Sequence, residues 1–148
     1  MKLKDNPFST KEGFKIGDKI IDFSTPKIMG VINVTPDSFF DGGKNNSIEK
    51  TILKAHEMVL EGAEFIDVGG YSSRPGADEV SVEEEINRTV PVVQAIYSSI
   101  PGVSISIDTF RKTVAQKNIE AGATWVNDIS AGNMDSKMIP WIKENKIP

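Results

Sequence analysis

The chain has 148 residues, of which 39% are hydrophobic and 26% are charged, a balance typical of a globular protein with one modest core. Because it contains no cysteine and a single histidine, a disulfide framework, a cysteine-rich zinc site and a multi-histidine metal site are all excluded. The net charge of −4, with the two signs interspersed, provides no basic face of the kind that binds nucleic acid, whereas small anionic ligands remain compatible with it.

The first 13 residues are polar and unpatterned, so we expect a loose N-terminal segment followed by one domain over residues 14–148. At the start of that domain, apolar residues on either side of Gly17 and Asp18 predict a short β-hairpin. The next apolar run, IMGVINV at residues 28–34, is short and rich in β-branched residues, which predicts a strand buried on both faces. It stops in polar and turn-forming residues at positions 35–38, and in α/β proteins such a strand end is where ligands bind.

Three further strands alternate with helices along the rest of the chain. Ser47 is the expected N-cap of the first helix. Ser81 and Glu84 form an expected capping box at the start of the second helix, in which Pro91 should cause a kink. The predicted strands cover residues 64–70, 104–108 and 122–128, and the predicted helices cover residues 47–61, 110–121 and 135–145 in addition to the one that begins near position 81.

A repeated six-residue pattern supports this order of elements. GAEFID at residues 62–67 and GATWVN at residues 122–127 both place a helix-ending Gly-Ala before two large apolar residues and an Asp or Asn. Four strand and helix units in succession predict a parallel sheet with right-handed crossovers. We therefore interpret this α/β chain as the N-terminal half of a TIM (β/α)8 barrel, four parallel βα units preceded by the hairpin, with the C-terminal half absent. A self-contained doubly wound sheet of four strands is the alternative, disfavoured because no Gly-x-Gly-x-x-Gly follows the first strand.

Each of the four predicted strands carries a polar side chain at its end: Asn33, Asp67, Asp108 and Asn127. Because the parallel strands of a barrel end at the same rim, we expect these side chains to face one ligand, and burying them without a partner would cost free energy. A ligand rich in N–H donors would satisfy them. Other interpretations remain open: Asp108 could cap the next helix, Asn127 with Asp128 could form a turn, and Asp67 could support the site without touching a ligand.

The loop SSRPG at residues 72–76 has the features of an anion site, since it offers two hydroxyls, a guanidinium that can hold phosphate oxygens at two points, and a glycine. An exposed turn is an equally valid interpretation of this string. Arg111 is a second candidate cation, although a solvated helix residue is the safer interpretation.

Five segments of the chain resemble dihydropteroate synthase, in order and spacing, across nearly the whole of residues 14–148. They are IMGVINVTPDSFFDGGK (residues 28–44), GAEFIDVGGYSSRPGA (62–77), SVEEE (81–85), SISIDT (104–109) and GATWVNDIS (122–130). The resemblance implies a (β/α)8 barrel that joins p-aminobenzoate to 6-hydroxymethyl-7,8-dihydropterin diphosphate and releases pyrophosphate, with Mg²⁺ assisting. It also implies a homodimer for the complete enzyme.

Carried over position by position, the resemblance gives the strand-end residues roles in that reaction. Asn33 would help to hold the metal-bound diphosphate, Asp108 and Asn127 would bind the edge of the pterin ring, and Asp67 is a further substrate-binding residue. A carboxylate can accept two hydrogen bonds from the guanidine-like edge of a pterin, which agrees with the role of Asp108. The expected catalytic residues are Asn33, Asp108 and Arg74.

The two loops complete the expected site. Ser73 and Arg74 would contact the diphosphate and, with Pro75, shape the aminobenzoate pocket, over which the first loop would close with Phe39 in it. Many members have a threonine where this chain has Ser73 and an acidic residue where it has Tyr71. No protein nucleophile is needed, because departure of the diphosphate makes the pterin electrophilic.

The family residues of the later strands are absent: a further pterin-binding Asp, a Lys over the pterin, and an Arg and a His of the anion site. We therefore expect the 148-residue chain to be poorly active or inactive by itself, and the open edges of its first and fourth strands to favour self-association. Two alternatives remain. One is a pterin-binding module without catalysis, like the barrel that presents methyltetrahydrofolate to corrinoid methyltransferases, which would have no use for the two loops. The other is a structural half-barrel fragment without a ligand.

The partners we expect are small molecules, not nucleic acid or a membrane. No stretch resembles a signal peptide or approaches the roughly 18 apolar residues of a membrane span, so we expect a cytoplasmic protein.

Overall fold

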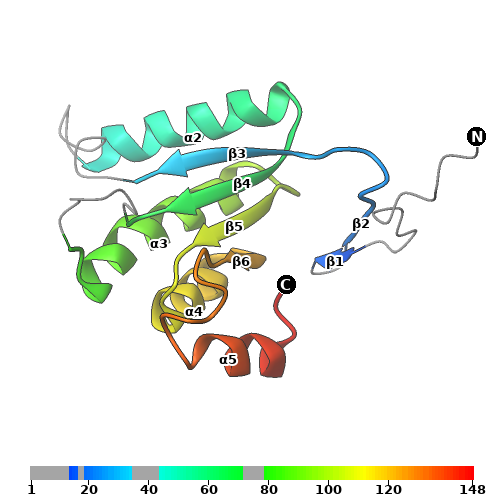
Figure 1. The fold of residues 1–148 in the computed structure, drawn as a ribbon. Helices are drawn as coiled ribbons and strands as arrows, with labels where there is room; N and C mark the ends of the chain where they lie inside the picture. The colour runs from blue at the N-terminus through cyan, green and yellow to red at the C-terminus, as the bar shows by residue number, and fades with distance from the viewer. Residues whose placement is uncertain (1–13, 17–18, 35–43, 72–78) are drawn as a thin grey trace, which may run out of the picture.

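The structure is a computed structural model, and it describes residues 14–16, 19–34, 44–71 and 79–148 (Figure 1). A small antiparallel hairpin, β1 (Phe14–Ile16) and β2 (Lys19–Ile21), precedes a larger sheet, as the sequence predicts. Figure 1 shows this hairpin on the side of the sheet where the strands begin. No helix in the described part of the chain is both long and apolar enough to cross a membrane.

The larger sheet has four parallel strands in consecutive order, each followed by a helix. The strands are β3 (Ile28–Asn33), β4 (Ala63–Gly69), β5 (Ser104–Asp108) and β6 (Trp125–Asn127), and the helices are α2 (Lys44–Leu60), α3 (Val82–Ser99), α4 (Lys112–Ala121) and α5 (Met138–Asn145). Right-handed crossovers between consecutive neighbours place their helices on the same face. A doubly wound sheet would instead reverse its strand order and carry helices on both faces, so that alternative is wrong for this chain.

The core lies between the sheet and this layer of helices. Alternate strand residues point toward the helices, and those on the central strands are fully buried: Ile66, Val68, Ile105 and Ile107. They meet the apolar stripe of α3, in which Val92, Val93 and Ile96 recur at helical spacing. α3 also packs against α2 and α4, so these three helices form one layer on the sheet (Figure 1).

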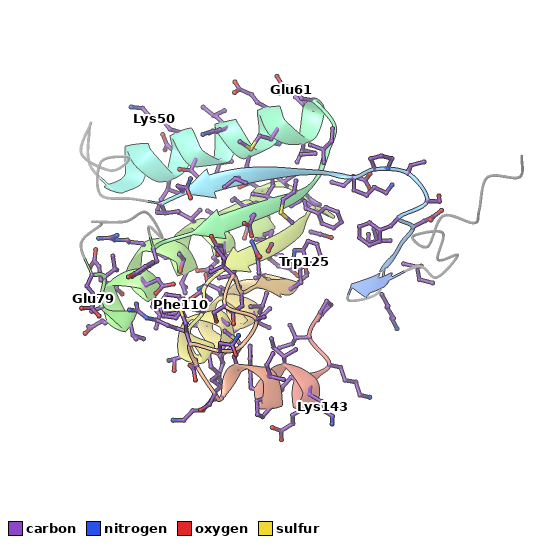
Figure 2. The ribbon with its side chains drawn as sticks, in the orientation of Figure 1. Lys50, Glu61, Glu79, Phe110, Trp125 and Lys143 are labelled. Carbon is purple, nitrogen blue, oxygen red and sulfur yellow. The ribbon has the colours of Figure 1, made fainter. Side chains whose placement is uncertain are left out.

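The opposite, inner face of the sheet carries aromatic side chains near the beginning of the strands and polar ones near their ends. Phe65 stacks on Phe23 with ring centroids 6.3 Å apart and packs against Trp125 at 4.8 Å. Figure 2 shows Trp125 toward the hairpin and Phe110 at the other end of the sheet. The aromatic cluster therefore closes one end of the inner face and leaves the other to the polar residues.

Several local predictions need correction. The first helix begins at Lys44, so Ser47 lies inside it and is not its N-cap. β6 has three residues instead of seven, and β3 is not buried on both faces, because Val31 on its inner face is 49% exposed and no other described strand lies opposite it. α3 contains Pro91 within its bounds, and the kink expected there stays a prediction.

The capping box at the start of α3 is half confirmed. The Ser81 hydroxyl accepts a hydrogen bond from the Glu84 backbone N–H at 3.1 Å. The Glu84 carboxylate instead pairs with Arg88 one turn further along the helix, at 2.8 Å.

The sheet edges are formed by the first and fourth strands, as expected. The outer edge of β6 is not wholly open, because the Val126 N–H donates to the Pro148 carbonyl at 3.0 Å.

Candidate functional site

The ends of the four strands lie side by side in one row of the sheet. The register pairs Asn33 with Gly69, Gly69 with Asp108, and Asp108 with Asn127. Residues paired in this way point to the same face. A methyl group built on Gly69 would lie 3.4 Å from Asp108 Oδ2 and 3.5 Å from Asn33 Oδ1, which shows that both side chains lean over the glycine on the inner face. The predicted convergence of strand ends is therefore present.

Asp67 lies one row deeper on the same face and reaches the site through a side-chain contact. The Asn127 Nδ2 donates to Asp67 Oδ2 at 3.1 Å, so a residue of β4 and a residue of β6 meet across β5. The Asp67 side chain is buried, and its second oxygen, Oδ1, has no hydrogen-bond partner. The other three strand-end residues are less buried than expected: Asp108 is half-buried, and Asn33 and Asn127 are exposed.

The capping interpretation of Asp108 is wrong. The N-cap of α4 is Arg111, and its backbone N–H donates to the Thr109 hydroxyl at 3.2 Å. The turn expected of Asn127 with Asp128 is present, and Asp128 holds it: its carboxylate accepts from the backbone N–H groups of Ser130 and Gly132. The Asn127 side chain donates to Asp67 instead.

The charge of Asp108 is perturbed by its surroundings. Burial first, and then the negative charges of Asp67, Glu85 and Asp128, together raise the pKa of its carboxyl to about 6. At pH 7 the group is still largely ionised, but it is a carboxylate crowded by other carboxylates. A ligand that brings N–H donors to it would relieve this crowding, and perturbed carboxyl groups of this kind gather at functional sites.

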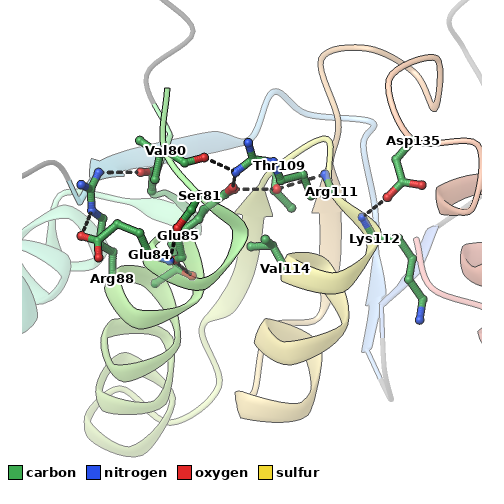
Figure 3. Close-up of polar contacts among 12 residues, drawn as sticks. Val80, Ser81, Glu84, Glu85, Arg88, Thr109, Arg111, Lys112, Val114 and Asp135 are labelled. Carbon is green, nitrogen blue, oxygen red and sulfur yellow. Dashed lines mark hydrogen bonds and ion pairs between the residues drawn. The ribbon is translucent and has the colours of Figure 1, made fainter. Parts of the chain in front are cut away.

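Arg111 is not the solvated helix residue that the sequence suggested. Its Nη1 donates to Glu85 Oε2 and to the Val80 carbonyl, both at 2.7 Å (Figure 3). Its guanidinium also lies over the rings of Tyr71 and Phe110, with centroids at 5.2 and 5.0 Å. Because the buried carboxylate already neutralises this cation, Arg111 is a poor candidate for binding a substrate anion.

Glu85 and Thr109 are the residues that sequence reasoning missed. Glu85 is fully buried and accepts a hydrogen bond from the Thr109 hydroxyl at 2.7 Å. A signal was present, because helical spacing places Glu85 on the same face as Thr89, Val92 and Ile96, the buried stripe of α3.

The predicted residues on the two loops, Phe39, Ser73, Arg74 and Pro75, lie outside the described residues. Within the described ranges, no three His, Cys, Asp or Glu side chains gather closely enough to hold a metal ion. Magnesium in proteins usually keeps several water ligands and takes the rest from one or two protein oxygens and a bound phosphate. The amide oxygen of Asn33, at the rim beside Gly69, fits the place of a single protein ligand.

Comparison with known proteins places this arrangement in a family. The model of the family described as "Pterin binding enzyme" matches residues 29–148. The dihydropteroate synthase of Bacillus subtilis is 47% identical over 121 residues, which cover 82% of this chain and 42% of that protein. The chain thus spans less than half the length of this relative.

Solved structures agree with the fold. The dihydropteroate synthase of Xanthomonas albilineans with 4-aminobenzoic acid matches with a TM-score of 0.81 and 34% identity, over 90% of this chain and 49% of that one. The same enzyme in complex with 7,8-dihydropteroate matches with a TM-score of 0.74 and 32% identity, over 87% and 46%. The four parallel units of this chain therefore correspond to half of a (β/α)8 barrel.

Proposed function

Because the chain belongs to the pterin-binding enzyme family, we propose that it forms the N-terminal part of a dihydropteroate synthase. The reaction joins the amine of p-aminobenzoate to the methylene carbon of 6-hydroxymethyl-7,8-dihydropterin diphosphate, with loss of pyrophosphate. One observation carries this proposal: the row of strand-end side chains that brings Asp108, Asn127 and Asn33 to one face. The ligands named for the X. albilineans enzyme, 4-aminobenzoic acid and 7,8-dihydropteroate, are one substrate and the product of this reaction.

We assign recognition of the pterin to Asp108 and Asn127, the β5 and β6 members of the row. The ionised Asp108 accepts two hydrogen bonds from the amino and ring N–H groups along the pterin edge. The Asn127 amide is oriented by its hydrogen bond to Asp67, which leaves its carbonyl oxygen to accept from the ligand. Asp67 thus acts at least partly through Asn127, and its second oxygen offers a further acceptor.

We assign departure of the diphosphate to Asn33, at the β3 end of the row. The carbon–oxygen bond breaks and its electron pair stays on the diphosphate, which leaves the methylene carbon electrophilic; the amine nitrogen then attacks this carbon and loses a proton to water or to the released pyrophosphate. Asn33 lies where it can hold the leaving group, and Mg²⁺ bound to that group would supply neutralising charge. We assign Ser73 and Arg74 to the diphosphate, and Pro75 and Phe39 to the aminobenzoate pocket, on their positions in the matching motifs.

Two further features of the complete enzyme belong to the same proposal. We expect a homodimer in the cytoplasm, with small molecules as its substrates. Sedimentation of the complete protein tests the homodimer, and a stable monomer at micromolar concentration would contradict it.

Calorimetric titration of the chain with 6-hydroxymethylpterin, and separately with pyrophosphate in the presence of Mg²⁺, tests the proposal. We expect both ligands to bind. Asp108→Asn should lower the affinity for the pterin and leave the affinity for pyrophosphate unchanged. Asp22→Asn makes the same chemical change at an exposed position outside the row and should leave both affinities unchanged. Binding of the pterin without pyrophosphate would favour a pterin-binding module that performs no condensation. Failure to bind the pterin would refute both functions.

A further inference from the structure

Glu85 is a fully buried acid whose two carboxylate oxygens are both used by the segment that follows Asp108. Oε1 accepts from the Thr109 hydroxyl and Oε2 accepts from Arg111 Nη1, each at 2.7 Å (Figure 3). The donors are one and three residues beyond Asp108, whereas Glu85 itself belongs to α3. A single side chain of one helix therefore fixes the start of the next βα loop.

The same side chain also lies against the end of β4. A methyl group built on Gly70 would come within 3.3 Å of Glu85 Cγ and of its backbone oxygen. One turn along α3, Arg88 Nη1 donates to the Gly70 carbonyl at 3.2 Å. Glu85 thus stands between the ends of β4 and β5, the two strands that carry Asp67 and Asp108.

Stability alone gives a weak reason for this arrangement. Glu85 is completely buried and the Arg111 side chain is 15% exposed, so both charges have lost most of their hydration. A well-packed apolar pair of similar volume is often as stable as a buried ion pair, or more so. What an apolar pair could not do is hold the Thr109 hydroxyl, which itself accepts from the Arg111 backbone N–H, by a directed hydrogen bond.

We propose that Glu85 is a positioning residue for pterin recognition, which fixes Asp108 on the inner face by holding Thr109 and Arg111. This inference rests on the proposed function. The two carboxylate oxygens of Glu85 are bonded to Thr109 and Arg111, so it acts through these two neighbours on the β5–α4 segment. The chain at Thr109 is held from the other side as well, because its N–H donates to the Asn127 carbonyl at 3.1 Å. Loss of Glu85 therefore frees one side of a segment that β6 still holds on the other.

Three variants separate positioning from stability. Glu85→Gln keeps an acceptor for Thr109 and removes the charge that holds Arg111. Glu85→Leu combined with Arg111→Met removes both charges together, so that neither is left buried and unpaired. Glu84→Gln is the matched control, because Glu84 is the preceding residue of the same motif and its carboxylate is half exposed and paired with Arg88.

The measurements are calorimetric titration with 6-hydroxymethylpterin and with pyrophosphate, thermal unfolding, and amide hydrogen exchange at residues 109–111. We expect Glu85→Gln to lower the affinity for the pterin by roughly tenfold or more and to leave the affinity for pyrophosphate unchanged. A loss of this size is common when a residue that supports a binding group is removed. The double variant should regain melting temperature but not pterin affinity. Hydrogen exchange at the Arg111 amide should be faster in Glu85→Gln and in the double variant. Glu84→Gln should match the unmodified chain in all of these measurements.

A double variant that binds the pterin as tightly as the unmodified chain would overturn the inference, and so would unchanged exchange at residues 109–111. The proposed function fails in a different way. If the unmodified chain does not bind the pterin while exchange still responds to Glu85→Gln, the function is wrong and the positioning of this segment by Glu85 stands.

Discussion

Replacing Asp108 by asparagine is expected to stabilise the fold at neutral pH while it removes a binding group. The side chain is half-buried and its pKa is raised to about 6, first by burial and then by Asp67, Glu85 and Asp128. A carboxyl whose pKa is higher in the folded state than in the unfolded state binds more protons when folded. It therefore destabilises the fold above pH 6, and this penalty fades as the pH falls toward the ordinary value of 3.8.

The size of the effect follows from the shift. From 3.8 to about 6 is about 2 pKa units, and at 1.36 kcal/mol per unit a fully buried group would cost ~3 kcal/mol. Because Asp108 is only half-buried, solvent screening reduces the expected gain from Asp108→Asn to about 1 kcal/mol. For a chain of this size that corresponds to a rise in melting temperature of about 2–4 °C.

Thermal unfolding of the unmodified chain and the Asp108→Asn variant at pH 8 and at pH 4 measures this directly. The variant should melt higher at pH 8, and the difference should largely vanish at pH 4, where the native carboxyl is protonated. A variant that is no more stable at pH 8, or that gains equally at both pH values, would refute the electrostatic reasoning.

Three further predictions concern packing, the metal and activity. Gly70→Ala should destabilise the fold by roughly 1–3 kcal/mol in chemical denaturation, because the added methyl would lie 2.6 Å from Thr89 Cγ2, whereas Gly69→Ala, with no contact closer than 3.4 Å, should cost less. Asn33→Ala should lower the affinity for pyrophosphate more in the presence of Mg²⁺ than without it, and an equal loss under both conditions would contradict a role for Asn33 as a metal ligand. The purified 148-residue chain should form pteroate far more slowly than a complete synthase; comparable steady-state rates would contradict the assignment of half a site to these residues.

The sequence predicted the sheet well because its strands are short apolar runs that end in polar residues. β5 has the predicted bounds, and β3 and β4 differ from prediction by one residue at each changed end. The predicted ends of helices and strands were wrong where the residues that mark an end also fit another position. Ser47 is a residue type that often caps a helix, yet α2 begins at Lys44. Of the seven residues predicted for the fourth strand, only the three of β6 pair with β5.

The site was predictable in its convergence but not in its contacts. Parallel pairing alone brings Asn33, Asp108 and Asn127 into one row. The hydrogen bond between Asp67 and Asn127 joins residues 60 positions apart, and the pair of Glu85 and Arg111 joins residues 26 apart. The first contact depends on how β4 and β6 lie on either side of β5, and the second on how α3 packs against the sheet. Local sequence patterns specify neither arrangement.

A crystal structure of the chain with bound 6-hydroxymethylpterin would test the central claim most directly. The pterin edge is expected within hydrogen-bond distance of the Asp108 carboxylate and the Asn127 amide, with its hydroxymethyl group directed toward Asn33. A pterin bound elsewhere on the chain, with none of these three side chains in contact, would contradict it.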